Sequence, residues 1–76
     1  MKWKDYIESN PEVLFGKPVL KGTRISVELI LEKLGEGTSE DQLLKSYPNL
    51  SSKQIQACLL FAAQSLRGEV TFPVAS

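Results

Sequence analysis

The sequence contains no histidine and a single cysteine, Cys58, among its 76 residues. One thiol excludes an internal disulfide, and without histidine the chain lacks the side chains from which transition-metal sites are usually built. A nucleophilic cysteine also needs a basic partner, which the apolar neighbours Ala57, Leu59 and Leu60 do not supply. We therefore expect an inert, packed thiol in a reducing cytoplasm, with no metal and no cofactor.

Long hydrophobic runs and an excess of charge of one sign are also missing. No segment approaches the roughly 20 apolar residues of a membrane span, and the first ten residues have no apolar region of the signal-peptide type. Nine Lys and Arg balance nine Asp and Glu, so the overall basic excess of strong nucleic-acid binders is absent. We expect no membrane partner, and any contact with DNA must be local.

The remaining composition is typical of a small folded domain. Hydrophobic residues make up 42% of the chain and charged residues 24%, close to the averages of globular proteins. A chain of this length forms one domain and buries only about 60% of its unfolded surface. Because disulfides and metals are excluded as additional stabilisation, we expect a second copy of the chain to supply it, in a homodimer.

Hydrophobic residues at helical spacing predict three helices between residues 27 and 67. The first begins at Val27, continues with apolar residues at i+3, i+4 and i+7, and ends near Gly35. Ser39 is a favourable N-cap for a second helix, which stops before Pro48. The acidic residues that follow Ser39 suit the positive end of that helix.

The third predicted helix begins at Ser51 or Ser52 and ends at Gly68. Its core-facing side is expected to consist of Ile55, Cys58, Leu59, Ala62 and Leu66. The other side is also apolar, with Ala57, Leu60 and Phe61. We expect the N-terminal residues or a second copy of the chain to cover that second side.

Residues 1–26 predict an N-terminal arm and a small β element. Asn10-Pro11-Glu12 is typical of a single helical turn, because Asn caps well and Pro suits the first helical position. Two short β-branched runs, Pro18–Leu20 and Thr23–Val27, flank Lys21-Gly22. This arrangement predicts a β-hairpin or an extended bend about the Lys-Gly pair.

Three short helices joined by a glycine turn and the Pro48-Asn49-Leu50 turn resemble a helix-turn-helix fold, in which the second helix braces the third against DNA. We therefore expect a single, mainly α domain. It consists of an N-terminal arm and β element (1–26), a homeodomain-like three-helix core (27–67) and a C-terminal tail (68–76).

The start of the third helix is polar and free of acids, as a recognition helix requires, because its first residues reach base edges. The stretch from residue 16 to residue 25 is basic and also free of acids, which suits contact with phosphates. A solvated helix start and a turn-forming glycine motif are the alternative interpretation. The candidate DNA-binding residues are Ser51, Ser52, Lys53, Gln54, Gln56, Lys17, Lys21 and Arg24.

A partner surface is expected on the outer side of the third helix and in the tail, where alternate residues are apolar as in a strand. Its candidate residues are Ala57, Leu60, Phe61, Val70, Phe72 and Val74. Deletion of residues 69–76 should weaken association and leave the helical content unchanged. A stripe of acids four residues apart, Glu28, Glu32 and Glu36, is either a solvated face or a site for a basic partner.

The sequence from Asn10 to Ala63 resembles the domain-of-unknown-function family 433, small homeodomain-like or winged-helix proteins of bacteria and archaea. Its most specific part is GKPVLKGTRI at residues 16–25, supported by Gly37, Ser39 and the YPNL of residues 47–50. The similarity covers about residues 7–63. At residues 52–54, Ser-Lys-Gln stands where the family more commonly has acids, which favours DNA contact.

The resemblance implies an antitoxin-like protein, which binds a toxin similar to PIN-type ribonucleases and represses its own promoter. A non-enzymatic interaction module that dimerises and holds a partner without touching DNA is the alternative. Neutral net charge favours the module, and the acid-free start of the third helix favours the DNA-binding regulator. Enzymatic activity is disfavoured, because no histidine is available as a base and no pair of acids is expected in an apolar cleft.

Overall fold

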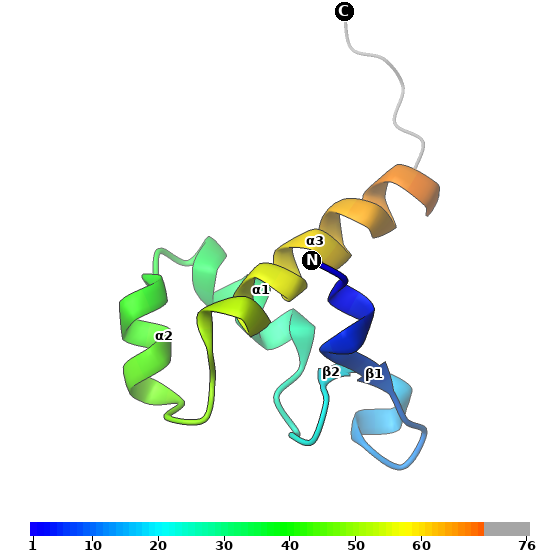
Figure 1. Ribbon diagram of the computed structural model, residues 1–76, viewed down its shortest axis with the longest axis horizontal. Coiled ribbons are helices and arrows are strands. Elements are labelled where there is room, and N and C mark those ends of the chain that lie inside the picture. The colour runs from blue at the N-terminus through cyan, green and yellow to red at the C-terminus, as the bar shows by residue number, and fades with distance from the viewer. Residues whose placement is uncertain (70–76) are drawn as a thin grey trace, which may run out of the picture.

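Two short 3-10 helices, a two-stranded sheet and three α-helices make up residues 1–69, the part of the chain that the computed structural model describes (Figure 1). The elements are η1 (Trp3–Asp5), β1 (Ile7–Ser9), η2 (Leu14–Gly16), β2 (Pro18–Leu20), α1 (Val27–Gly35), α2 (Glu40–Ser46) and α3 (Ser52–Glu69). The domain is mainly helical, as predicted. None of the helices within this range is long and apolar enough to cross a membrane.

Each α-helix begins where a serine caps it, which confirms the predicted starts. The Ser26 hydroxyl accepts a hydrogen bond from the backbone N–H of Leu29 at 3.0 Å. Ser39 and Gln42 form a reciprocal capping box, with distances of 2.9 and 3.1 Å. Ser51 starts α3 in the same way through Gln54. These local hydrogen bonds satisfy backbone N–H groups that have no partner within the helix.

Of the two arrangements predicted about Lys21-Gly22, the bend is present and the hairpin is not; the β-hairpin of this N-terminal region is formed by β1 and β2 instead. The strand β2 pairs antiparallel with β1, in the register Ile7↔Leu20 and Ser9↔Pro18, and residues 23–27 contribute a single bridge between Val19 and Ser26. The hydroxyl of Thr23 explains the difference, because it donates to the Leu20 carbonyl at 2.8 Å and accepts from the Ile25 N–H at 3.0 Å. These two hydrogen bonds bend the backbone at residues 23–25, so that the chain leads directly to Ser26, the N-cap of α1, and does not continue as a second strand.

The predicted single turn at Asn10-Pro11-Glu12 is present, closed by a hydrogen bond from the Val13 N–H to the Asn10 carbonyl at 2.9 Å. The side-chain oxygen of Asn10 accepts from the backbone N–H of Glu12 at 2.9 Å, which makes an Asx turn within the β1–β2 connection. The side chain of Asn10 thus caps the turn at its first residue, as predicted, and the turn does not continue as an α-helix.

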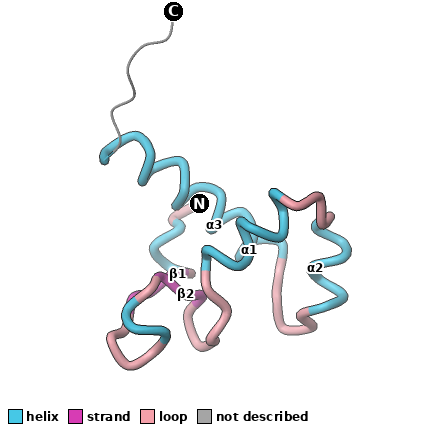
Figure 2. The backbone as a smooth tube through the Cα atoms, turned by 180° about the vertical axis from the view of Figure 1, so that it is seen from behind, coloured by secondary structure: helices cyan, strands magenta, loops and turns pink. Residues whose placement is uncertain are grey.

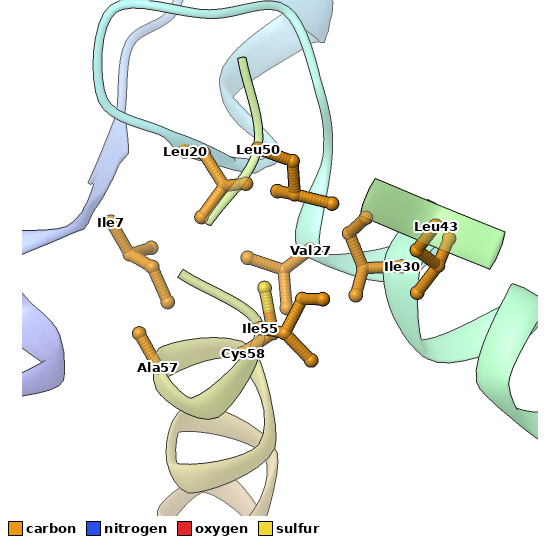
Figure 3. Packing of buried hydrophobic residues seen from close by; sticks show 9 residues of the cluster. All are labelled: Ile7, Leu20, Val27, Ile30, Leu43, Leu50, Ile55, Ala57 and Cys58. Carbon is orange, nitrogen blue, oxygen red and sulfur yellow. The ribbon is translucent and has the colours of Figure 1, made fainter. Parts of the chain in front are cut away.

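The hydrophobic core contains residues from both strands and all three α-helices (Figure 3). Its nine buried residues are Ile7, Leu20, Val27, Ile30, Leu43, Leu50, Ile55, Ala57 and Cys58. Cys58 is completely buried, as the sequence predicted, and desolvation raises the pKa of its thiol to about 11. A buried, protonated thiol contributes to packing of the core and is a poor nucleophile.

The predicted inner and outer sides of α3 need correction. Leu59 and Leu66 are 49% and 54% exposed, whereas Ala57, assigned to the outer side, is fully buried. For Leu66 the reason is that the C-terminal part of α3 extends past the body of the domain (Figures 1 and 2). Only the first half of the helix contributes residues to the core.

The N-terminal arm covers part of the second side of α3, as the sequence predicted. The rings of Trp3 and Phe61 stack edge to face with centroids 4.9 Å apart. The indole N–H of Trp3 also donates to the side-chain oxygen of Gln64. These contacts hold η1 against the side of α3 that carries Phe61 and Gln64.

An unusual backbone lies at the tip of the β1–β2 connection. Leu14, Phe15 and Gly16 all have positive φ values, of 49°, 58° and 84°. Glycine adopts this conformation without strain, but for Leu14 and Phe15 it is unfavourable. The conformation turns the Phe15 side chain outward, where it is 99% exposed.

Relief of this strain gives a first testable prediction. Phe15→Gly should be more stable than Phe15→Ala by up to about 1 kcal/mol, because glycine removes about 1–2 kcal/mol of left-handed strain and adds about 0.5–1 kcal/mol of unfolded-state entropy. Denaturant unfolding of the two variants in dilute solution measures the difference. Equal stabilities would show that residue 15 does not hold a left-handed backbone.

Candidate nucleic-acid and partner surfaces

The first turns of α3 carry the predicted DNA-binding residues of that helix. Ser52, Lys53 and Gln56 are exposed, and the first turn contains no acid. Gln54 is half-buried, and its side-chain oxygen accepts a hydrogen bond from the Ser51 N–H at 2.8 Å. The amide of Gln54 therefore has a structural role that the sequence analysis did not assign, alongside any contact with a base.

The basic loop between β2 and α1, residues 21–25, has a fixed shape. The Thr23 N–H donates to the Leu20 carbonyl at 3.0 Å across a four-residue turn whose third residue, Gly22, has φ +76°. A positive φ at that position is what a type II turn requires. Lys21 and Arg24 are exposed on this loop. Gly22 and Thr23 of the GKPVLKGTRI segment thus determine the backbone conformation of the loop. The side chains of Lys21 and Arg24 are exposed to solvent.

The basic loop lies near the connection that leads into α3. Leu20 and Leu50, which immediately precede the loop and Ser51, pack next to one another in the core (Figure 3). The bend at residues 21–25 and the connection between α2 and α3 both reach the lower edge in Figures 1 and 2, and from there the connection rises to the start of α3. We call the exposed residues of the basic loop and of the first turns of α3, namely Lys21, Arg24, Ser52, Lys53 and Gln56, the polar edge.

Lys17 differs from the other basic candidates. Its ammonium group forms an ion pair with Glu28 at 3.3 Å, and the two side chains are 57% and 58% exposed. A pair this exposed contributes at most about 1 kcal/mol, so a stronger anion competes with it easily. The structure nevertheless draws Lys17 towards α1 and its acidic stripe.

A shallow groove opens beside this ion pair. Its volume is about 440 Å³ and it lies between β2, α1 and α3. The residues that line it are Lys17, Pro18, Val27, Glu28, Leu31, Glu32 and Phe61. Sequence analysis singled out Phe61 as a partner contact but missed the groove, because three elements far apart in sequence form it. We call it the α1 groove.

The remaining partner candidates have different fates. Ala57 is fully buried and faces the core, so its assignment to a partner surface is wrong. Leu60 is 41% exposed, and Phe61 is half-buried between Trp3 and the α1 groove. Val70, Phe72 and Val74 lie outside the described residues.

Comparison with known proteins identifies the family. The model of the family described as "protein of unknown function (DUF433)" matches residues 7–62. The chain belongs to the DUF433 family. This confirms the resemblance on which the sequence analysis relied, over nearly the same residues.

Two DUF433-related comparisons add detail. A crystal structure of a DUF433 member from Anabaena variabilis ATCC 29413 superposes with a TM-score of 0.79 at 25% identity, over 84% of this chain and 63% of that one. The uncharacterized protein y4eO of Sinorhizobium fredii (strain NBRC 101917 / NGR234) is 32% identical over 66 residues. That match spans 86% of this chain but 30% of y4eO, so the DUF433 chain corresponds to a minor part of the larger protein.

Proposed function

We propose that this DUF433 protein is an antitoxin-like DNA-binding regulator that acts as a homodimer. In this proposal α2 and α3 work as a helix-turn-helix pair, with the start of α3 in the major groove. The observation that carries the proposal is the polar edge, which combines an exposed, acid-free helix start with an exposed basic loop of fixed shape. Side chains of Ser52 and Gln56 read bases, and Lys21, Arg24 and Lys53 contact phosphates.

The balance of charge sets the expected strength of binding. Each subunit offers Lys21, Arg24 and Lys53, and Lys17 as well when phosphate displaces Glu28. A dimer therefore neutralises about six to eight phosphates, because each such contact releases roughly one counterion. Acids elsewhere balance these charges, so binding to arbitrary DNA should be weak and specific binding should depend on dimerisation.

Salt dependence provides a second prediction. Lys53→Gln should reduce the slope of log affinity against log salt by about two for a dimer, since one phosphate contact per subunit is lost. Titration of the DNA upstream of the protein's own reading frame, at several salt concentrations, measures the slope. Arg67→Gln is the matched control, because Arg67 is also exposed but lies in the last turn of α3, about 20 Å along the helix.

Base reading requires a separate variant. Gln54→Ala should relax base preference, but it also removes the capping hydrogen bond to Ser51, so Gln56→Ala is the cleaner test. A lost base contact should reduce the preference for upstream DNA over scrambled DNA by about 1–3 kcal/mol. Equal affinity of the unaltered protein for the two DNAs would refute the regulator and favour the interaction module.

The antitoxin part of the proposal concerns a basic surface on a PIN-like ribonuclease. The acids Glu28, Glu32 and Glu36 are exposed along α1, on an element that does not form the polar edge. Glu36, the last of these acids, does not line the α1 groove, so a partner held at Glu36 leaves both that groove and the start of α3 free. Co-purification with a PIN-like protein encoded beside this chain tests the idea, and Glu36→Lys should weaken the association.

A further inference from the structure

Phe15 is the most exposed large hydrophobic residue among residues 1–69. Its side chain is 99% exposed, and a strained left-handed backbone holds it away from the domain. Neither the hydrophobic core nor any described aromatic pair includes it. A fold gains nothing from a solvated phenyl ring on a strained turn, so the feature points to a contact with another molecule.

The α1 groove has the dimensions and chemistry to receive an aromatic ring. Its volume of about 440 Å³ lies within the range of small-ligand pockets, about 300–1,000 Å³. Pro18, Val27, Leu31 and Phe61 give it an apolar floor. The edge-to-face contact between Trp3 and Phe61 holds the last of these walls in place.

The ring and the groove are close together on the same chain. Phe15 precedes Pro18, a lining residue, by three positions, so their Cα atoms lie within about 11 Å. Phe15 does not line its own groove. In a symmetric dimer, a two-fold axis between the two features would place each ring at the groove of the other copy, which is a self-complementary contact.

We propose that the α1 groove binds Phe15 of a second copy of this chain, in a reciprocal exchange that forms the homodimer. Charge supports this occupant, because Lys17 follows Phe15 by two residues and enters beside the acidic rim of the other groove. That rim carries Glu28 and also Glu32, which has no ion pair within residues 1–69. Lys17 of one copy thus meets Glu32 of the other, so in this dimer about six phosphate contacts remain, from Lys21, Arg24 and Lys53 of the two subunits.

The area involved predicts the strength of the dimer. A buried phenylalanine removes about 150–250 Å² from solvent. Two rings and the groove walls that they cover give about 600–1,000 Å², which is below the about 1,200–2,000 Å² of stable specific interfaces and in the range of weak, transient ones. We therefore expect weak association, at micromolar concentration or above. The contact extends the dimer on which the proposed function depends, but it requires no DNA, so the two proposals fail in different experiments.

Oligomeric state in solution is the third prediction. Light scattering at rising protein concentration should show about twice the chain mass of 8.4 kDa. Phe15→Ser should raise the dissociation constant about thirtyfold or more, as expected for a central aromatic anchor, with an unchanged circular dichroism spectrum. Leu66→Ser, also at an exposed apolar position, is the control and should dimerise normally. A monomer at every concentration, or an intact Phe15→Ser dimer, would overturn the proposal.

Disulfide trapping locates the ring. A mixture of Phe15→Cys and Glu32→Cys chains should form a mixed disulfide dimer under mild oxidation, whereas Phe15→Cys with Glu36→Cys should not, since Glu36 lies one turn beyond the groove. The buried Cys58 does not compete. Equal trapping at both positions would overturn the proposal. The proposal would also be overturned if a chain truncated after Glu69 lost the dimer while the Phe15→Ser variant retained it. Residues 70–76 would then be the segment that occupies the α1 groove.

Discussion

Leu20→Ala should leave little folded protein at room temperature. Leu20 is completely buried at the centre of the domain, where it joins β2 to Leu50 ahead of α3 (Figure 3). Large-to-small changes at such sites cost about 2–5 kcal/mol, from lost burial and the cavity that remains. A domain of this size has roughly 3–5 kcal/mol of stability in total. The same change also removes the contact that aligns the basic loop with the start of α3.

Leu59→Ala is the matched control, because it deletes the same atoms at a position that is 49% exposed. Its cost should be within about 0.5 kcal/mol, as is usual for surface substitutions. Denaturant unfolding followed by circular dichroism compares the two variants. A similar loss at both positions would mean that Leu59 is buried in solution, either in the core, as its spacing predicted, or in an interface.

The helices were predictable because their signals are local. Serine caps followed by Gln42 or Gln54 three residues later, and glycines after α1, specify helix ends within a few residues of chain. The hydrophobic period then predicts which residues of α1 face inward, and Val27 and Ile30 are indeed buried. None of these inferences needs knowledge of the rest of the fold.

The strand pairing and the inner side of α3 were not predictable for the opposite reason. The residues that pair with β2 lie nine to thirteen positions upstream, and the hydroxyl of Thr23 favours a bend over the nearer hairpin. On α3, a small residue, Ala57, is buried and a large one, Leu66, is exposed, because the helix is longer than the body that it packs against. Periodicity reports an apolar side but not where the neighbouring elements end.

The candidate surfaces divide in the same way. The exposed polar start of α3 follows from composition and capping, so sequence reasoning located it. The ion pair of Lys17 with Glu28, the α1 groove and the outward turn of Phe15 depend on packing between separate elements. Sequence reasoning treated Lys17 as a free cation. It passed over Phe15, because the three consecutive positive φ values that make this turn distinctive are visible only in the structure.

Cys58 gives a prediction for alkaline solution, because burial separates the pKa of the folded and unfolded states. Desolvation raises the pKa of the folded thiol to about 11, from 9.0 in an exposed cysteine. Below the unfolded pKa both states are protonated, and the packing of the thiol contributes fully to stability. As the pH rises through that value the unfolded chain loses its proton first, so the free energy of unfolding falls until the folded thiol also ionises.

The loss attributable to Cys58 should reach about 2–3 kcal/mol, since each pKa unit corresponds to about 1.4 kcal/mol. Lysines and tyrosines titrate in the same range, so the test compares the protein with Cys58→Ala by denaturant unfolding at neutral pH and near the folded pKa of about 11. Near neutral pH the alanine variant should be the less stable, because it lacks the buried sulfur. At high pH the order should reverse, since alanine has no proton to lose. Two stability curves that stay parallel throughout would contradict a thiol sealed in the core.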